Sequence, residues 1–355
     1  MTQDTLSDVL RGVRLRGAVF FHVSGHSAWA AEAPAAKELA SLLMPGVEHV
    51  MEYHAVAEGN CWAGLTGGPA VPMAAGDVVL FPHGDAHVVS SAPGMRGRTD
   101  MSWLSSARLD TLPLRVAYDG LDALEAPPHD RPASATVVCG FLGCDLQPFN
   151  PLIAALPRML HLRASPQDAW ITEFTRHAVA ESHAQRPGGE AMLARMSEMM
   201  FVNAVRRYAD ELPARSTGWL AGLRDRYIGR ALALLHEAPS HDWTLDELGS
   251  RIGLSRSALH EHFVDLVGVP PMQYLTQWRM QAAARMLIET RATVASIALD
   301  VGYESEAAFA RAFKRLVGKP PATWRRDRSE NRGPDSLAGP HPHDEDVPRG
   351  PEWPH

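Results

Sequence analysis

The chain has 355 residues, of which 45% are hydrophobic and 21% charged, and its formal net charge at pH 7 is −7. This length favours two domains over one, and the composition is that of an ordinary globular protein. Three cysteines exclude a disulfide framework, and no apolar run approaches the roughly 18 residues of a membrane helix, so we expect a cytoplasmic protein without a membrane partner.

The charge is unevenly distributed along the chain. Residues 224–328 contain 15 Lys and Arg against 12 Asp and Glu, whereas residues 1–223 contain 17 against 23 and the last 27 residues contain 2 against 6. Only the segment 224–328 is therefore basic, as contact with a phosphate backbone requires. The excess is small, so charge alone does not identify a nucleic-acid-binding protein.

The first part of the chain is rich in β-type segments. Predicted strands cover residues 13–23, 49–56, 61–65 and 78–82. Glu58, Gly59 and Asn60 predict a turn between the second and the third strand. Short strands separated by glycine turns are typical of a barrel or jelly roll, so we expect residues 1–160 to form a β-barrel domain.

A spaced motif accompanies the last of these strands. Gly76 is followed after five residues by PHGDAH at residues 82–87, which fits the second cupin motif, Pro-x-Gly-x-x-His. Upstream, Glu52 stands seven residues before Gly59, as the glutamate does in the first cupin motif. Residues 1–160 therefore resemble a small cupin barrel, and the resemblance implies an effector-binding domain.

The same region contains candidate metal ligands. Cupins often hold a metal through two or three histidines and a glutamate, because neutral imidazole and carboxylate suit divalent ions. The His-x-His pair expected before the glutamate is incomplete: His49 lies upstream of Glu52, and His54 lies downstream. Alternation along the strand places Glu52 with His54 and puts His49 on the other face, so His49 needs a bulge to join them. His87 completes either set.

Two interpretations of these histidines remain open. They are either hydrogen-bonded histidines of the barrel or metal ligands, and a site of Glu52, His54 and His87 is geometrically as plausible as one that uses His49. The sequence contains no motif that requires a cofactor. A divalent metal ion in the barrel is the one candidate cofactor.

The three cysteines, Cys61, Cys139 and Cys144, also have two interpretations. Cys139 and Cys144 are separated by four residues, which is not the C-x-x-C spacing of redox motifs and zinc knuckles. They are interpreted first as small buried residues. The alternative is a redox role, and a disulfide between Cys61 and Cys139 requires their Cα atoms to lie within about 7 Å.

The pattern becomes helical after the predicted barrel. Apolar residues at helical spacing predict a helix that begins near Ser165 and a longer one over residues 190–210. Pro213 and Gly218 interrupt the pattern and mark a domain junction. We therefore expect residues 161–223 to form a helical pair followed by a linker.

An internal repeat dominates the basic segment. The pattern of residues 245–275 returns in residues 294–324, where FVDLVGVPP is followed fifty residues later by FKRLVGKPP. Each copy predicts two short helices around a tight turn, with apolar residues at spacings of three and four, and Gly253 supplies the first turn. A helix without Gly or Pro joins the copies, so two helix-turn-helix units are held at a fixed separation.

This repeat resembles the DNA-binding domain of the AraC/XylS family of bacterial transcription regulators, which is two helix-turn-helix units joined by a helix. The matching residues are Leu254-Ser255, Ala258-Leu259, Phe263, Gly268, Pro270-Pro271, Val301-Gly302-Tyr303, Ser305, Phe309, Arg311, Phe313-Lys314 and Pro320-Pro321-Trp324-Arg325. The resemblance covers residues 224–326, and many such regulators carry an N-terminal cupin barrel. The expected fold class is thus α+β with two domains, a cupin-like barrel plus helices and an all-α domain.

The resemblance implies a sequence-specific transcription regulator, an activator controlled by a small molecule or a redox signal, without enzymatic activity or catalytic residues. Its implied partners are double-stranded promoter DNA, RNA polymerase and a small-molecule effector. In similar proteins the helical pair after the cupin supports dimerisation. We therefore expect the chain to form a homodimer through residues 161–223. The alternative is a cupin metalloenzyme, or a metal- or redox-sensing protein, fused to a helical interaction module.

The outward positions of the two recognition helices are the candidate DNA contacts. They are Arg256, Ser257, His260 and Glu261 in the first helix and Ser305, Glu306, Ala307, Arg311, Lys314 and Arg315 in the second. By resemblance, Ala307 and Arg311 approach bases, whereas Lys314 and Arg315 contact the DNA backbone. Glu261 departs from the basic residue frequent at its position and is suited to accept a hydrogen bond from cytosine N4.

Residues 327–355 are rich in proline, glycine and acidic residues and nearly lack apolar ones. Such a segment cannot bury a core, which predicts a disordered tail. His341, His343 and His355 within it are opportunistic metal ligands at most.

Overall fold

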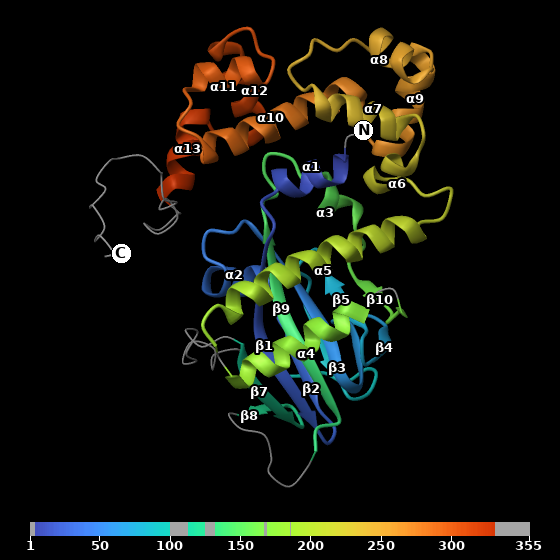
Figure 1. Cartoon of the computed structure of the whole chain (residues 1–355), viewed down its shortest axis with the longest axis vertical. Coiled ribbons are helices and arrows are strands. Elements are labelled where there is room, and N and C mark those ends of the chain that lie inside the picture. The colour runs from blue at the N-terminus through green and yellow to red at the C-terminus, as the bar shows by residue number, and fades with distance from the viewer. Residues whose placement is uncertain (1–3, 100–112, 125–131, 167–168, 185, 331–355) are drawn as a thin grey trace, which may run out of the picture.

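The structure is a computed structural model that describes residues 4–99, 113–124, 132–166, 169–184 and 186–330 (Figure 1). The strands are β1 (Arg16–His26), β2 (Ala30–Ala33), β3 (His49–Leu65), β4 (Ala70–Ala74), β5 (Val78–Phe81), β6 (His87–Ser90), β7 (Leu114–Asp119), β8 (Asp122–Leu124), β9 (Ala135–Cys144) and β10 (Leu160–Leu162). The helices are α1 (Thr5–Gly12), α2 (Ala36–Leu43), α3 (Pro151–Ala155), α4 (Ala169–Ala184), α5 (Gly189–Glu211), α6 (Trp219–Arg224), α7 (Ile228–Glu237), α8 (Leu245–Ile252), α9 (Arg256–Val267), α10 (Pro271–Glu289), α11 (Val294–Asp300), α12 (Glu306–Val317) and α13 (Pro321–Glu330). The strands form one end of the molecule, and α6 to α13 form the other.

The long strand β3 organises the barrel. Its first half pairs with β5 and β9 and its second half with β4 and β6, always antiparallel. Along the path β10-β5-β3-β9-β1-β7-β8, only the β1–β7 pair is parallel. This nearly closed mixed barrel, with helices around it and an all-α region after it, confirms the predicted fold class. β10 carries the barrel to residue 162, slightly past its expected end at residue 160.

The predicted turn at residues 58–60 is wrong, because β3 continues through it to Leu65. The pairing of β3 with β9 instead shifts register between Val56 and Glu58, as it does at a β-bulge. Gly59 adopts a φ of 76°, and a Cβ there would lie 2.1 Å from the carbonyl oxygen of Ser134. The glycine therefore marks an irregularity within one strand, which in sequence is indistinguishable from a hairpin turn.

Helices α4 and α5 lie across one face of the barrel (Figure 1), and they are the two helices predicted after it. Tyr53 of β3 is fully buried beneath them, and its hydroxyl lies 2.7 Å from Ser197 Oγ of α5. Glu198, one residue further along α5, accepts a hydrogen bond from the N–H of Gly17 at 3.1 Å. These contacts attach the helical pair to both β3 and β1.

Both predicted helix-turn-helix units are present, at the two ends of α10 (Figure 1). Each recognition helix begins with a serine cap: Ser255 Oγ accepts the N–H of Ala258 at 3.3 Å, and Ser305 Oγ accepts the N–H of Ala308 at 3.2 Å. Gly253, with a φ of 82°, ends α8 in the left-handed conformation that few other residues adopt. The sequence predicted these units because caps and turns are local features.

The connecting helix α10 is attached directly to the N-terminal domain. Gln281 in its middle is only 2% exposed. Its Nε2 donates to the carbonyl oxygen of Gly12, at the end of α1, over 2.7 Å, and its Oε1 accepts the N–H of Phe149 over 3.0 Å. One side-chain amide therefore fixes the helix between the helix-turn-helix units against two segments of the N-terminal domain.

A second attachment forms where β9 ends. Arg14 donates to both carboxylate oxygens of Asp145, from Nε at 2.5 Å and from Nη2 at 2.9 Å. Arg328 of α13 lies 3.4 Å from the same carboxylate and also pairs with Glu48. The carboxylate of Asp145 thus links the start of the barrel to the last helix of the C-terminal region.

Helix α13 extends to Glu330, so the first four residues of the expected disordered tail are helical. The remaining residues of that tail, 331–355, lie outside the described residues. Among the described residues, no helix is both long and apolar enough to cross a lipid bilayer.

We predict that Gln281→Glu destabilises the protein by about 1–3 kcal/mol, because a carboxylate oxygen then faces the carbonyl oxygen of Gly12 where an N–H now donates. Urea denaturation of the two proteins measures the difference in unfolding free energy. Gln273→Glu is the matched control, since Gln273 is exposed on the same helix. Equal effects of the two substitutions would show that the buried amide contributes nothing specific.

Candidate functional site

The first candidate surface is formed by the two recognition helices, α9 and α12. All ten predicted DNA-contacting residues, including Ser305 at the α12 cap, are exposed to solvent. Within the described part of the chain, no carboxylate forms an ion pair with Arg311 or Lys314, whereas Arg256 lies 3.3 Å from Asp246. The free cations of α12 are therefore available to an external anion, and their role in DNA binding stays a prediction.

The second candidate site is a cavity inside the barrel with a volume of about 60 Å³. Most of its wall is apolar and includes Phe21, Trp29 and Phe141. The sequence analysis missed these wall residues, because nothing in the sequence distinguishes them from other apolar residues of strands. The remaining lining residues include the polar side chains of Glu52, His54 and His87, which the cupin motifs predicted.

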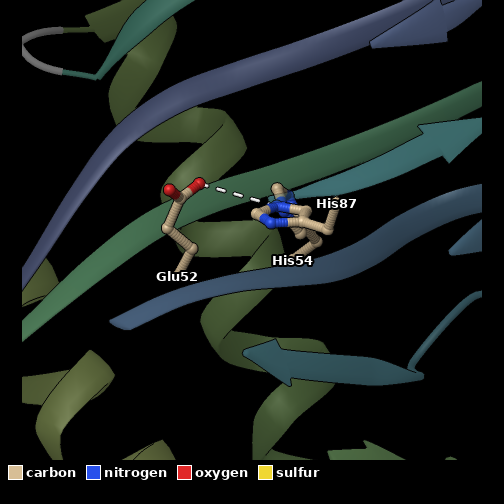
Figure 2. A group of neighbouring side chains, drawn as sticks. All are labelled: Glu52, His54 and His87. Carbon is tan, nitrogen blue, oxygen red and sulfur yellow. Dashed lines mark hydrogen bonds and ion pairs between the residues drawn. The ribbon is translucent and has the colours of Figure 1, made fainter. Parts of the chain in front are cut away.

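Glu52, His54 and His87 all line this cavity, and their side chains lie next to one another (Figure 2). Glu52 and His54 project from β3 on the same side, as strand alternation predicted, and His87 begins the neighbouring β6. The Nε2 atoms of the two histidines are 2.6 Å apart, and His87 Nε2 lies 3.5 Å from Glu52 Oε2. One potential ligand atom from each residue lies within 4.8 Å of the others.

His49 takes no part in this cluster. Its Nε2 lies 2.7 Å from the carbonyl oxygen of Pro82, where it ties β3 to the segment after β5. Of the two ligand sets that the sequence left open, the structure therefore assembles Glu52, His54 and His87, while His49 is a hydrogen-bonded histidine of the barrel.

The hydrogen bonds assign the protons of the two clustered histidines. His87 Nδ1 lies 2.8 Å from the carbonyl oxygen of Asp85, which can only accept, so Nδ1 carries the proton and Nε2 presents a lone pair. His54 then donates from its own Nε2 to His87, and its Nδ1 accepts the thiol proton of Cys139 over 2.8 Å. Burial lowers the pKa of His87 to about 4, so both rings are neutral near pH 7.

Glu52 differs from the two histidines, because one of its side-chain oxygens forms no hydrogen bond with any described residue. Its Oε1 is buried and, among the described residues, has no hydrogen-bond partner. Burial raises the pKa of this carboxyl to about 8. Burying an oxygen without a hydrogen-bond donor costs free energy.

The three cysteines are all buried free thiols. Cys139 lines the cavity, whereas Cys144, at the end of β9, lies 3.7 Å from Asn150 Nδ2. Burial raises the pKa of Cys61 to about 12 and also raises that of Cys139 and Cys144. Protonated thiols are weak nucleophiles, and the predicted redox role of these cysteines stays a prediction.

Two family models cover most of the chain. The model described as "Cupin" matches residues 4–210, which is more than half of the chain, and the model described as "Helix-turn-helix domain" matches residues 248–327. The chain belongs to the AraC family, with an N-terminal cupin domain. The predicted resemblance is therefore confirmed.

Named relatives agree with this assignment. The AraC-family chain is 26% identical to the HTH-type transcriptional regulator AlkR of Acinetobacter baylyi over 329 residues, which is 91% of this chain and 99% of AlkR. It is 38% identical over 176 residues to a putative AraC-like transcription regulator of Streptomyces lividans, covering 49% of this chain and 58% of that protein. The chain thus spans little more than half the length of the Streptomyces relatives.

Solved structures also match parts of the chain. The DNA-binding domain of AdpA, in complex with a target DNA, is 25% identical and covers 31% of this chain and 99% of that domain, with a TM-score of 0.30. ToxT from Vibrio cholerae is 12% identical and covers 88% of this chain and 94% of its own, with a TM-score of 0.31.

The cap of the second recognition helix is open to a direct test. Ser305→Ala removes the oxygen that accepts the N–H of Ala308, and we expect it to lower the unfolding free energy by about 1 kcal/mol. Ser305→Asn keeps an acceptor at the cap and is expected to retain most of the stability. Thermal unfolding followed by circular dichroism measures both, and a loss that is as large for Asn as for Ala would argue against capping.

Proposed function

We propose that this AraC-family protein is a sequence-specific DNA-binding transcription regulator whose barrel binds an effector. The observation that carries the proposal is the placement of two exposed recognition helices at the ends of one connecting helix, where Arg311 and Lys314 of α12 form no ion pair with any carboxylate of the described residues. The proposed partners are double-stranded promoter DNA and RNA polymerase, with activation as the expected direction of control. We propose no catalytic activity for the barrel, and we expect the protein to act in the cytoplasm.

The length of α10 supports simultaneous binding of both recognition helices. Its 19 residues make a rod of about 28 Å at 1.5 Å per residue. This length is comparable with the roughly 34 Å between successive major grooves on one face of DNA. A rigid rod also lowers the entropic cost of placing the second unit once the first is bound.

The two recognition helices differ in the chemistry that they offer to DNA. α12 presents Arg311, Lys314 and Arg315, whereas α9 presents Glu261 and pairs its Arg256 with Asp246. We propose that α12 supplies most of the phosphate attraction, and that Arg311 reads a guanine through two parallel hydrogen bonds.

A homodimer is the proposed assembly, and α5 offers a surface for it. Met192 and Met199 of this helix are 39% and 49% exposed, and they lie seven residues apart, which places them on one side of the helix. Exposed methionines at this spacing suit a second copy of the same helix. Two copies would present four recognition helices, as paired half-sites in DNA require.

The proposal is tested by selecting bound sequences from a random DNA pool with the full chain and then comparing variants on the selected site and on scrambled DNA. We expect Arg311→Ala to weaken binding to the selected site by about 5- to 150-fold, which corresponds to about 1–3 kcal/mol, with little change in thermal stability. Arg311→Lys keeps the charge but not the paired hydrogen bonds, so it should behave like Ala on the selected site.

Two controls separate base recognition from phosphate attraction. Lys314→Ala should weaken binding to selected and scrambled DNA alike, because phosphate contacts carry no sequence information. Arg98→Ala, which removes an exposed arginine of the barrel domain that pairs with Asp122, should change neither. Recovery of no preferred sequence by the wild-type chain would overturn the proposed function.

A further inference from the structure

We propose that Glu52, His54 and His87 bind a divalent transition-metal ion inside the barrel and that this ion is the signal that the regulator senses. That the cluster binds a metal ion is independent of what the protein does. That the ion is the signal rests on the proposed function, because it requires the ion to alter DNA binding.

The donor set and its spacing suit such an ion. Metal–ligand distances of about 2.0–2.2 Å place neighbouring donors roughly 3–3.5 Å apart. The 3.5 Å between Glu52 Oε2 and His87 Nε2 already meets this requirement, and the 2.6 Å between the two histidine nitrogens needs only a small rotation of the rings. All three side chains are more than 90% buried, so the site is enclosed by protein.

The partnerless Oε1 of Glu52 is the second observation that points to a cation. The carboxyl is 3% exposed and lines the cavity, yet no donor among the described residues reaches this oxygen. A purely structural cluster would be expected to satisfy it with an N–H or O–H, as nearly all buried polar atoms are satisfied. A cation held by both carboxylate oxygens of Glu52 satisfies this oxygen.

The residues around the cluster hold the ligands in place. The carbonyl oxygen of Asp85 fixes the proton of His87 on Nδ1, so the lone pair of Nε2, which accepts from His54 in this structure, is the one that a metal would bind. The ring of Phe81 stacks on His87 with centroids 3.8 Å apart. Cys139 contacts the Nδ1 of His54, so when His54 Nε2 binds the ion, the proton moves to Nδ1 and donates to the sulfur. Cys139 is therefore a positioning residue.

Cavity size and donor chemistry narrow the choice of ligand. A volume of about 60 Å³ holds an ion and a few water molecules, whereas pockets for drug-sized molecules measure roughly 300–1,000 Å³. Two imidazoles and one carboxylate suit zinc, iron, cobalt or nickel, while calcium and magnesium prefer sites made of oxygen donors. The inferred signal is thus a first-row transition metal.

The segment before His87 connects the site to the C-terminal region. Within it, His83 Nε2 lies 2.9 Å from the carbonyl oxygen of Leu156, and Asp85 pairs with Arg158. Leu156 ends α3, which packs against α6 at the start of the C-terminal helices. An ion that ties His87 to β3 would hold this segment, and through it α3, in one position.

Isothermal titration of the metal-stripped full chain with Zn²⁺ tests the binding. Every protein in the series carries His341→Gln, His343→Gln and His355→Gln, which removes the tail histidines as competing ligands. We expect one ion per chain and a higher thermal midpoint with the ion. Glu52→Gln and His87→Gln should bind at least about tenfold more weakly.

The control variants change histidines outside the cluster, and they compare Cys139, which contacts His54, with Cys144, which does not. His49→Gln and His83→Gln should retain wild-type Zn²⁺ affinity, because those rings bond to backbone carbonyls. Cys139→Ser should weaken binding about 10- to 100-fold, while Cys144→Ser should not. Circular dichroism with chelator present shows whether each variant is folded. Absence of bound ion in the wild-type chain, or undiminished binding by Glu52→Gln and His87→Gln, overturns the inference.

A separate DNA-binding measurement, with Zn²⁺ or with chelator, distinguishes the two proposals. In the wild-type chain we expect Zn²⁺ to change the affinity for the selected DNA sequence at least about fivefold, which is within the usual range of allosteric coupling. In the Glu52→Gln variant, Zn²⁺ should leave this affinity unchanged. Sequence preference without bound metal would reject the metal site alone. Bound metal without any sequence preference would reject the proposed function alone. Bound metal that leaves DNA affinity unchanged would reject the ion as the signal.

Discussion

The position of β9 between β1 and β3 is the constraint on which the rest of the molecule depends. All ten residues of this strand are buried, and its two ladders close the centre of the barrel. Cys139 on β9 contacts His54 of β3 within the cavity, and Asp145 directly after the strand binds Arg14 and approaches Arg328 of α13. A single strand thus runs from the cavity wall to the contact with the C-terminal helices.

The polar cluster in the barrel is difficult to explain as a contribution to stability. Two neutral imidazoles, a thiol and a carboxyl are buried together, and Glu52 keeps an oxygen that no described residue satisfies. Apolar residues of similar volume would cost less to bury. Local conflicts of this kind are expected at functional sites, where the sequence is not optimised for stability alone.

The C-terminal region combines repetition with asymmetry. Both helix-turn-helix units use a serine cap and buried phenylalanines, such as Phe263 and Phe313, so their folds are equivalent. Their outward faces are not equivalent, since Glu261 and Arg311 give them opposite chemistry. The helix between them carries Gln281, whose amide binds the N-terminal domain. Any shift of the N-terminal domain therefore acts on the element that sets the separation of the two recognition helices.

The sequence by itself determined the local features: the two helix-turn-helix units, their serine caps and glycine turns, the helical pair and the cupin motif with Glu52 and His87. These features depend on residues a few positions apart, so their patterns can be recognised in the sequence before the fold is known. Only the tertiary structure decided which histidine joins the cluster, because His54 and His87 are 33 positions apart and meet across the interior of the barrel, where His87 pairs in the ladder with Leu65 and not with His54. The contact of Gln281 with Gly12, across 269 positions, has no local signature at all. Long-range contacts arise from strand register and domain packing, which no single segment encodes.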